Sequence, residues 1–94
     1  MKTITELSKL NGRVYIHLAT PVLGWQFLEQ AESEGFTFRD GVKPTQREAA
    51  DVMALNPDHT INYVGFAGHI AYQSGAKVVG QRPLIRVDAG HVLM

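Results

Sequence analysis

The segment from Arg13 to Phe38 constrains the fold more than any other part of the chain. It opens with RVYIHL, in which apolar residues alternate with polar or amphipathic ones, the pattern of a half-buried strand. Thr20 then offers a capping hydroxyl, and Pro21 suits the first helical position, where an N–H would have no partner. Gly35 is the residue type that commonly ends a helix, and FTF follows it. The segment therefore predicts a strand, a helix and a returning strand.

The rest of the chain predicts further strands beside that pair. ADVMAL and TINYV flank the turn formers Asn56-Pro57-Asp58-His59, which predicts a β-hairpin. Residues 42–48 are polar and are expected to form an exposed loop, and residues 83–88 predict the last strand, with Ile85 and Val87 facing inward. The expected fold is α+β, a mainly antiparallel sheet with one long helix packed across it, in the order β-α-β-β-β-(α)-β.

Length and composition limit the classes of protein. Ninety-four residues suffice for a single domain, with residues 1–12 as a possible loosely ordered arm. Nine basic residues balance nine acidic ones, which argues against a duplex nucleic-acid binder. The absence of cysteine favours a reducing compartment. Without a leader-like start or an apolar run of about 20 residues, we expect a cytoplasmic protein with no membrane partner.

Trp25 is the anomaly of the predicted helix. At about 100° per residue, the apolar face contains Leu23, Phe27 and Leu28, while Trp25 and Val22 fall well outside it. A large aromatic residue on a solvated face favours contact with another molecule, so Val22 and Trp25 are predicted interface residues of a homo-oligomer or a partner complex. The alternative is that Trp25 packs over the sheet edge or the N-terminal segment of its own chain.

The segment GFAGHIAYQSG, residues 65–75, is a second candidate, expected to form one helical turn or an irregular loop. Its glycines permit backbone geometries that let a ligand approach main-chain N–H groups, and its polar side chains can hydrogen-bond or stack on a nucleobase. The predicted ligand-binding residues are Gly65, Gly68, His69, Tyr72 and Gln73. The alternative is a tight crossover shaped by glycines, because neither GxGxxG nor a Walker motif occurs.

The loop after the second strand is a third candidate. Arg39, Lys43 and the hydroxyl of Thr45 are suited to hold a phosphate or carboxylate. Arg86, on the outward side of the last strand, would add positive charge if that strand is a neighbour. The alternative is a charged loop that is simply solvated.

No pattern in the sequence predicts catalysis, a metal site or a cofactor. The four histidines are widely separated, with neither an i,i+4 pair nor HExxH, and no serine lies in a nucleophile motif. The helix carboxylates, Glu29, Glu32 and Glu34, are interpreted as a solvated face. We therefore expect no catalytic residue, no bound metal and no cofactor.

Three passages together carry a resemblance to a known group of proteins. They are FLEQAESEGFTFRDGVKPT, DHTINYVGFAGHIAYQSG and LIRVD, and the resemblance covers residues 13–88, most of the chain. The chain resembles small uncharacterised proteins of bacteriophages and mobile elements of Firmicutes. The resemblance implies a genomic setting and no specific activity, so it transfers no functional residue.

Small phage proteins without enzymatic motifs often act by stoichiometric binding, and this setting gives the leading hypothesis. The protein is expected to be a non-enzymatic accessory protein, a homo-oligomer that sequesters a nucleotide-type signal of host defence in the host cytosol. One alternative is direct inhibition of a host defence protein, such as a CRISPR nuclease, through the surface around Trp25. Another is a small nucleotide-processing enzyme that uses His69.

Overall fold

The computed structural model describes residues 3–92, and a six-stranded sheet lies at its centre. The strand order is β2-β4-β3-β1-β6-β5, so β1 and β3, the strands richest in buried residues, occupy the middle. The strands are β1 (Arg13–His17), β2 (Thr37–Phe38), β3 (Val52–Asn56), β4 (Thr60–Tyr63), β5 (Val78–Val79) and β6 (Arg82–Asp88).

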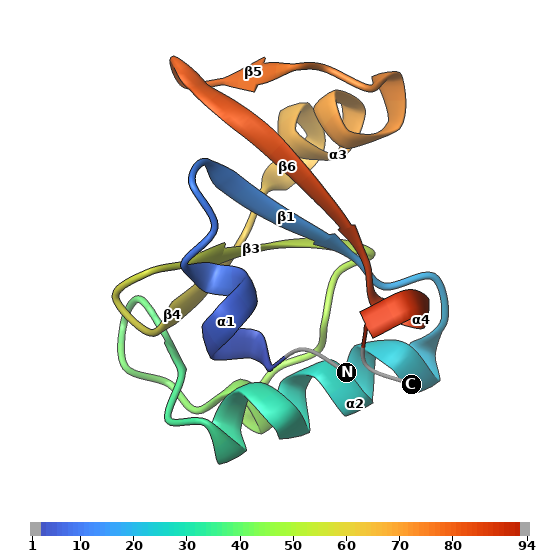
Figure 1. Cartoon of the computed structure of the whole chain (residues 1–94). Coiled ribbons are helices and arrows are strands. Elements are labelled where there is room, and N and C mark those ends of the chain that lie inside the picture. The colour runs from blue at the N-terminus through green and yellow to red at the C-terminus, as the bar shows by residue number, and fades with distance from the viewer. Residues whose placement is uncertain (1–2, 93–94) are drawn as a thin grey trace.

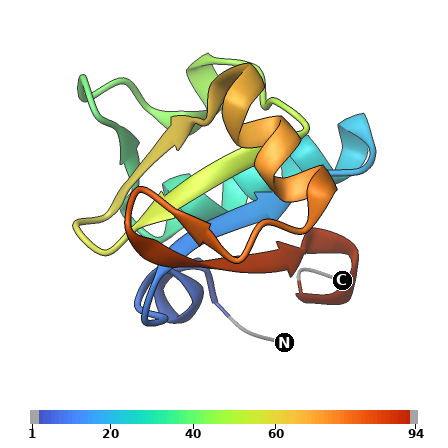
Figure 2. The ribbon, with the colours of Figure 1, turned by 90° about the horizontal axis from the view of Figure 1, so that it is seen from above.

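Helices lie on both faces of this sheet. Within residues 3–92 the α-helices are α1 (Ile4–Ser8), α2 (Pro21–Ser33), α3 (Gly65–Ser74) and α4 (Ala89–Val92), with a 3₁₀ turn, η1, at Pro44–Gln46. Figure 1 shows α1, α2 and α4 below the sheet and α3 above it, and Figure 2, seen from above, shows α3 lying over the strands. The α+β class predicted from the sequence is confirmed.

The prediction of a mainly antiparallel sheet with one long helix was wrong. The sheet is mixed, because β1 runs parallel to β6 and β2 runs parallel to β4, while the other three pairings are antiparallel. The β1–β6 pair is parallel because the chain leaves β4, forms α3 over the far face and returns as β6 beside β1. That crossing also gives the fold a second substantial helix, of ten residues against thirteen in α2.

The details of α2 follow the sequence. The Thr20 hydroxyl accepts a hydrogen bond from the main-chain N–H of Leu23 at 3.2 Å, and Pro21 is the first helical residue. Gly35 follows the helix with φ of 85°, a left-handed conformation that glycine adopts without steric cost. The buried face is the predicted one, formed by Leu23, Gly24, Phe27, Leu28 and Ala31.

The predicted hairpin and the predicted last strand are both present. β3 and β4 pair antiparallel around the turn, where His59 has φ of 64°. In β6, Val87 is buried and Ile85 packs against the core, as the alternation predicted. The main core lies between the sheet and the α1–α2–α4 layer, whereas a smaller cluster around Tyr15 and Val52 lies under α3.

Part of the predicted N-terminal arm is a helix. In α1, Ile4 and Leu7 are buried in the main core, and Thr3 and Glu6 form a reciprocal capping box. The expectation of a loosely ordered arm does not hold for residues 4–8, because two apolar residues at helical spacing reach the core. For residues 1–2, the expectation of a loosely ordered arm concerns residues outside the described part of the chain.

None of the helices in residues 3–92 has the length and apolar character needed to cross a lipid bilayer.

Candidate functional site

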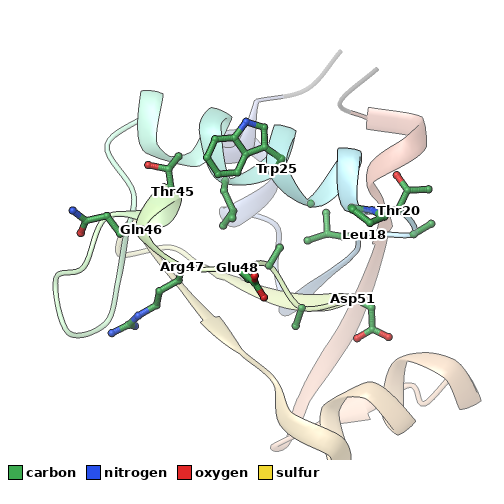
Figure 3. Close-up of a pocket in the computed structure, with 14 residues that line it drawn as sticks. Leu18, Thr20, Trp25, Thr45, Gln46, Arg47, Glu48 and Asp51 are labelled. Atoms are coloured by element: carbon green, nitrogen blue, oxygen red, sulfur yellow. The ribbon is translucent and has the colours of Figure 1, made fainter.

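A groove runs between α2 and the segment Thr45–Asp51, with a volume of about 870 Å³. Figure 3 shows Trp25 and Thr20 along one rim and the residues from Thr45 to Asp51 along the other. Leu18 and Leu28 contribute apolar surface between the two rims. We call this hollow the Trp25 groove, because its largest exposed apolar residue is Trp25, at 50% exposure.

Gly24 sets how closely the two walls approach. A Cβ atom at this position would lie 3.1 Å from the Cβ of Ala49, which is tighter than an ordinary van der Waals contact. The absence of a side chain on Gly24 therefore lets α2 pack directly on the segment beyond η1. Gly24 and Ala49 both line the groove, so this contact helps to define its shape.

The far wall of the groove is tied to α2 by Thr45. Its main-chain N–H and its hydroxyl both donate to Oε1 of Glu32, at 3.1 and 2.7 Å. These hydrogen bonds, with the hydroxyl first, lower the pKa of Glu32 below its ordinary value. Pro44, at the start of η1, is fully buried. The region predicted as an exposed loop is therefore anchored at Pro44 and Thr45.

Arg47 anchors the same loop on its outer side. Its guanidinium donates to both carboxylate oxygens of Asp40, at 3.2 and 2.5 Å, and lies 4.8 Å from the ring centroid of Phe38. The hydrogen bond from Arg47 is the main reason that the pKa of Asp40 lies below its ordinary value. Arg47 and Asp40 thus pair with each other within the loop.

The anion-binding residues predicted on this loop do not converge. Both donors of Thr45 are used by Glu32, so neither is available to a phosphate in this conformation. Arg39 and Lys43 are exposed and do not line the Trp25 groove. Arg86 lies elsewhere, on β6, where its guanidinium donates to the main-chain carbonyl of Tyr72 at 3.1 Å.

A second, smaller hollow adjoins the groove on the other side of Trp25. It has a volume of about 420 Å³ and is lined by Trp25, Glu29, Glu32, Ser33 and Thr45. Trp25, Glu29 and Glu32 are spaced by four and three residues, which places them on one face of α2. The spacing is visible in the sequence, where it predicts a solvated face, and in the structure Glu29 and Glu32 also line a hollow beside Trp25.

The residues predicted as a glycine-rich ligand loop form α3 instead. A Cβ on Gly68 would lie 2.4 Å from the Cβ of Val64, the residue that precedes α3, and 3.5 Å from the ring of Tyr15, which is an ordinary contact distance. This glycine therefore leaves room for the side chain of Val64. Gly75 ends the helix with φ of 72°. The helix α3 meets the far face of the sheet through Gly68 and Tyr72, whereas Phe66 and Ile70 are exposed, and the sequence alone did not reveal this packing.

The polar side chains predicted on α3 point to different neighbours. Nδ1 of His69 lies 2.9 Å from Oδ2 of Asp51, which also lines the Trp25 groove. The ring of Tyr72 stacks on His17 at 5.3 Å, and burial, followed by the charge of Asp88, raises its pKa. Gln73 is exposed. Of the predicted residues, Trp25 and Thr45 line the groove, and His69 reaches it through Asp51.

Val22 is the other predicted interface residue, and it is 66% exposed on α2, one turn before Trp25. The structure thus places Val22 and Trp25 on the solvent side of the helix, as the sequence predicted.

No three His, Asp or Glu side chains gather as a metal-binding group within residues 3–92. Comparison of the chain with protein-family models, with curated proteins and with solved structures finds no match. An open groove with an apolar floor, a half-exposed indole and several carboxylates is suited to bind another molecule.

Proposed function

We propose that the protein acts by stoichiometric binding and holds a protein partner in the Trp25 groove. The observation that carries the proposal is a half-exposed Trp25 on the rim of a hollow of about 870 Å³. Tryptophan is among the residues that contribute most to binding energy when a partner covers them. Val22 extends the apolar surface beside it.

The charges around the groove favour a protein over a nucleotide. Glu48 and Asp51 line the groove, and Glu29 and Glu32 line the adjoining hollow. Carboxylates repel phosphate groups, and the cations predicted to bind phosphate, Arg39 and Lys43, lie outside the groove. Arg47 does line the groove, but its guanidinium is bound to Asp40. Sequestration of a nucleotide signal is therefore the weaker of the two binding hypotheses.

One observation favours the enzymatic alternative. The carboxylate of Asp51 holds Nδ1 of His69, an arrangement that leaves the other ring nitrogen free to act as a base. In the described residues, however, no hydroxyl side chain is hydrogen-bonded to His69. We therefore assign the pair to positioning α3, and turnover of any bound molecule would reverse that assignment.

The resemblance to phage and mobile-element proteins of Firmicutes supports a specific kind of partner. A protein from such a setting would meet bacterial host proteins in the host cytosol, among them effectors of host defence. Its action would be inhibition by occupancy, which requires no catalytic group.

The test compares two exposed aromatic residues on opposite sides of the sheet. Tagged wild-type protein, Trp25→Ala and Phe66→Ala are used to capture proteins from a Firmicutes lysate, with quantitative mass spectrometry of what is retained. Phe66 is 72% exposed on α3, so it controls for the loss of an exposed ring. We expect a partner captured in stoichiometric amount by wild type and Phe66→Ala and lost with Trp25→Ala.

Equal capture by all three proteins would overturn the role of the groove. Native mass spectrometry of the same samples reports whether the occupant is a second copy of the chain. A wild-type dimer that dissociates in Trp25→Ala would identify the groove as a homo-oligomer interface, the assembly predicted from the sequence.

A further inference from the structure

The surroundings of the Trp25 groove carry an excess of negative charge. Four carboxylates line the groove and its adjoining hollow, namely those of Glu29, Glu32, Glu48 and Asp51. The nearby cations are Arg47 and Lys43. The guanidinium of Arg47 is hydrogen-bonded to Asp40, and Lys43 is close enough to lower the pKa of Glu32. Asp51 is paired with His69. Charge complementarity therefore favours an occupant with positive charge.

Two of these carboxylates have oxygen atoms free for a cation beside Trp25. Glu29 makes no hydrogen bond or ion pair within the described residues. Glu32 accepts both of its hydrogen bonds from Thr45 at Oε1, and Oε2 has no partner in the same part of the chain. The hydrogen bonds from Thr45, with the hydroxyl first, lower the pKa of Glu32 and so favour its charged form. Tryptophan is the best aromatic partner for a cation.

The main chain on the opposite rim is also incompletely paired. Residues 48–50 precede β3 and lie beyond the last residue pairs that β3 forms with β1 and β4, His17–Val52 and Tyr63–Met53. Their N–H groups make no hydrogen bond with any residue between 3 and 92. This segment leads into β3, a central strand, and the carbonyl of Glu48 accepts a hydrogen bond from the hydroxyl of Tyr63 at 2.6 Å. Its unpaired N–H groups are therefore the main-chain groups that can pair with the backbone of an extended peptide.

We propose that the occupant of the Trp25 groove is an extended peptide segment of the partner that carries a lysine or arginine beside apolar residues. Its cationic side chain lies over the indole of Trp25 between Glu29 and Glu32, and its backbone runs along residues 48–50. The inference rests on the proposed function and specifies the chemistry of the partner.

The test selects peptides without assuming a partner. A display library of random ten-residue peptides is selected on the purified protein, with Trp25→Ala as counter-selection. Binding of synthesised winners is then measured by fluorescence, because Trp25 is the only tryptophan of the chain and reports on the groove directly. We expect winners enriched in lysine or arginine next to apolar residues, with affinity that falls as salt is raised.

Two matched variants test the position of the cation. Glu29→Gln removes one carboxylate beside Trp25, and Asp58→Asn removes one from the exposed turn between β3 and β4. We expect Glu29→Gln to weaken the winning peptides by about two- to fivefold, the scale of an exposed ion pair, and Asp58→Asn to leave them unchanged. Methylation of the peptide's backbone nitrogens is expected to weaken binding further by removing main-chain hydrogen bonds.

The outcomes separate this inference from the proposed function. Winners that depend on Trp25 but are acidic, neutral or insensitive to backbone methylation would overturn the cationic, extended occupant and leave the groove as a binding site. A library that yields no Trp25-dependent peptide would overturn the peptide inference. The lysate experiment would still decide whether a folded protein surface binds there.

Discussion

One carboxylate oxygen of Glu34, Oε1, accepts hydrogen bonds from both the main-chain N–H and the hydroxyl of Thr5, at 2.7 and 2.6 Å. Its other oxygen accepts from the main-chain N–H of Ile4 at 2.9 Å. A residue that follows α2 therefore caps the beginning of α1, which lies 29 positions away in the chain. This contact joins two helices of the same layer.

Glu34→Gln is expected to lower the free energy of unfolding at pH 7 by about 1–3 kcal/mol, because main-chain N–H groups lose a charged acceptor. Burial raises the pKa of Glu34, but the hydrogen bonds from Thr5, Gln30 and Ile4 outweigh it, so the net pKa is below the ordinary value of 4.5. The stabilisation is thus present above pH 4.5 and is lost as the pH falls below it. Urea unfolding between pH 3 and pH 7 measures both effects.

The control for that measurement is Glu29→Gln, which removes a carboxylate without a partner in the described residues. It is expected to leave stability at pH 7 nearly unchanged. If both variants show the wild-type loss of stability between pH 4.5 and pH 3, the cap does not contribute.

Gly68→Ala is expected to destabilise the protein by about 1–3 kcal/mol, the usual cost of overpacking. The new methyl group would lie 2.4 Å from the Cβ of Val64, which cannot rotate away as the end of a long side chain could. Thermal unfolding checks the value. Gln73→Ala, at an exposed position of the same helix, is the control, and equal stability of the two variants would contradict the close contact between Gly68 and Val64.

Thr20→Ala is expected to cost about 1 kcal/mol, because the main-chain N–H of Leu23 loses its acceptor at the start of α2. Gln26→Ala, on the exposed face of α2, is expected to change stability by a few tenths of a kcal/mol at most. Chemical denaturation of both variants makes the comparison. A loss in Gln26→Ala as large as that in Thr20→Ala would assign the effect to something other than the cap.

Thr45→Val is expected to raise the pKa of Glu32 toward its ordinary value of 4.5, because the hydroxyl of Thr45 is the largest cause of its lowering. Carbon-13 NMR titration of the glutamate carboxyls measures this shift directly. The same variant should speed amide hydrogen exchange in η1, which loses one tie to α2. An unchanged pKa of Glu32 would show that the hydroxyl is not its partner in solution.

Local patterns predicted the elements that depend on neighbouring residues. The cap at Thr20, the end of α2 near Gly35 and the buried face with Phe27 all follow from spacing along one helix. The β3–β4 hairpin likewise depends on a short cluster of turn formers. The outward position of Trp25 was predicted by the same arithmetic of 100° per residue.

The sheet order and the site depend on contacts between distant residues. Nothing in GFAGHIAYQS distinguishes a helix over a sheet from a ligand loop, because Gly68 and Tyr72 meet their partners, such as Tyr15, only in the folded chain. The carboxylates of Glu29 and Glu32 line a hollow beside Trp25 only because Thr45, from a distant segment, packs next to them.

The sequence by itself determined the local elements and the outward turn of the indole, since both follow from periodicity and capping within a few residues. Only the tertiary structure decided that the sheet is mixed and that a groove lies between α2 and the segment Thr45–Asp51. The physical reason is that strand pairing and groove walls are set by packing between segments far apart in the chain, which no local pattern specifies.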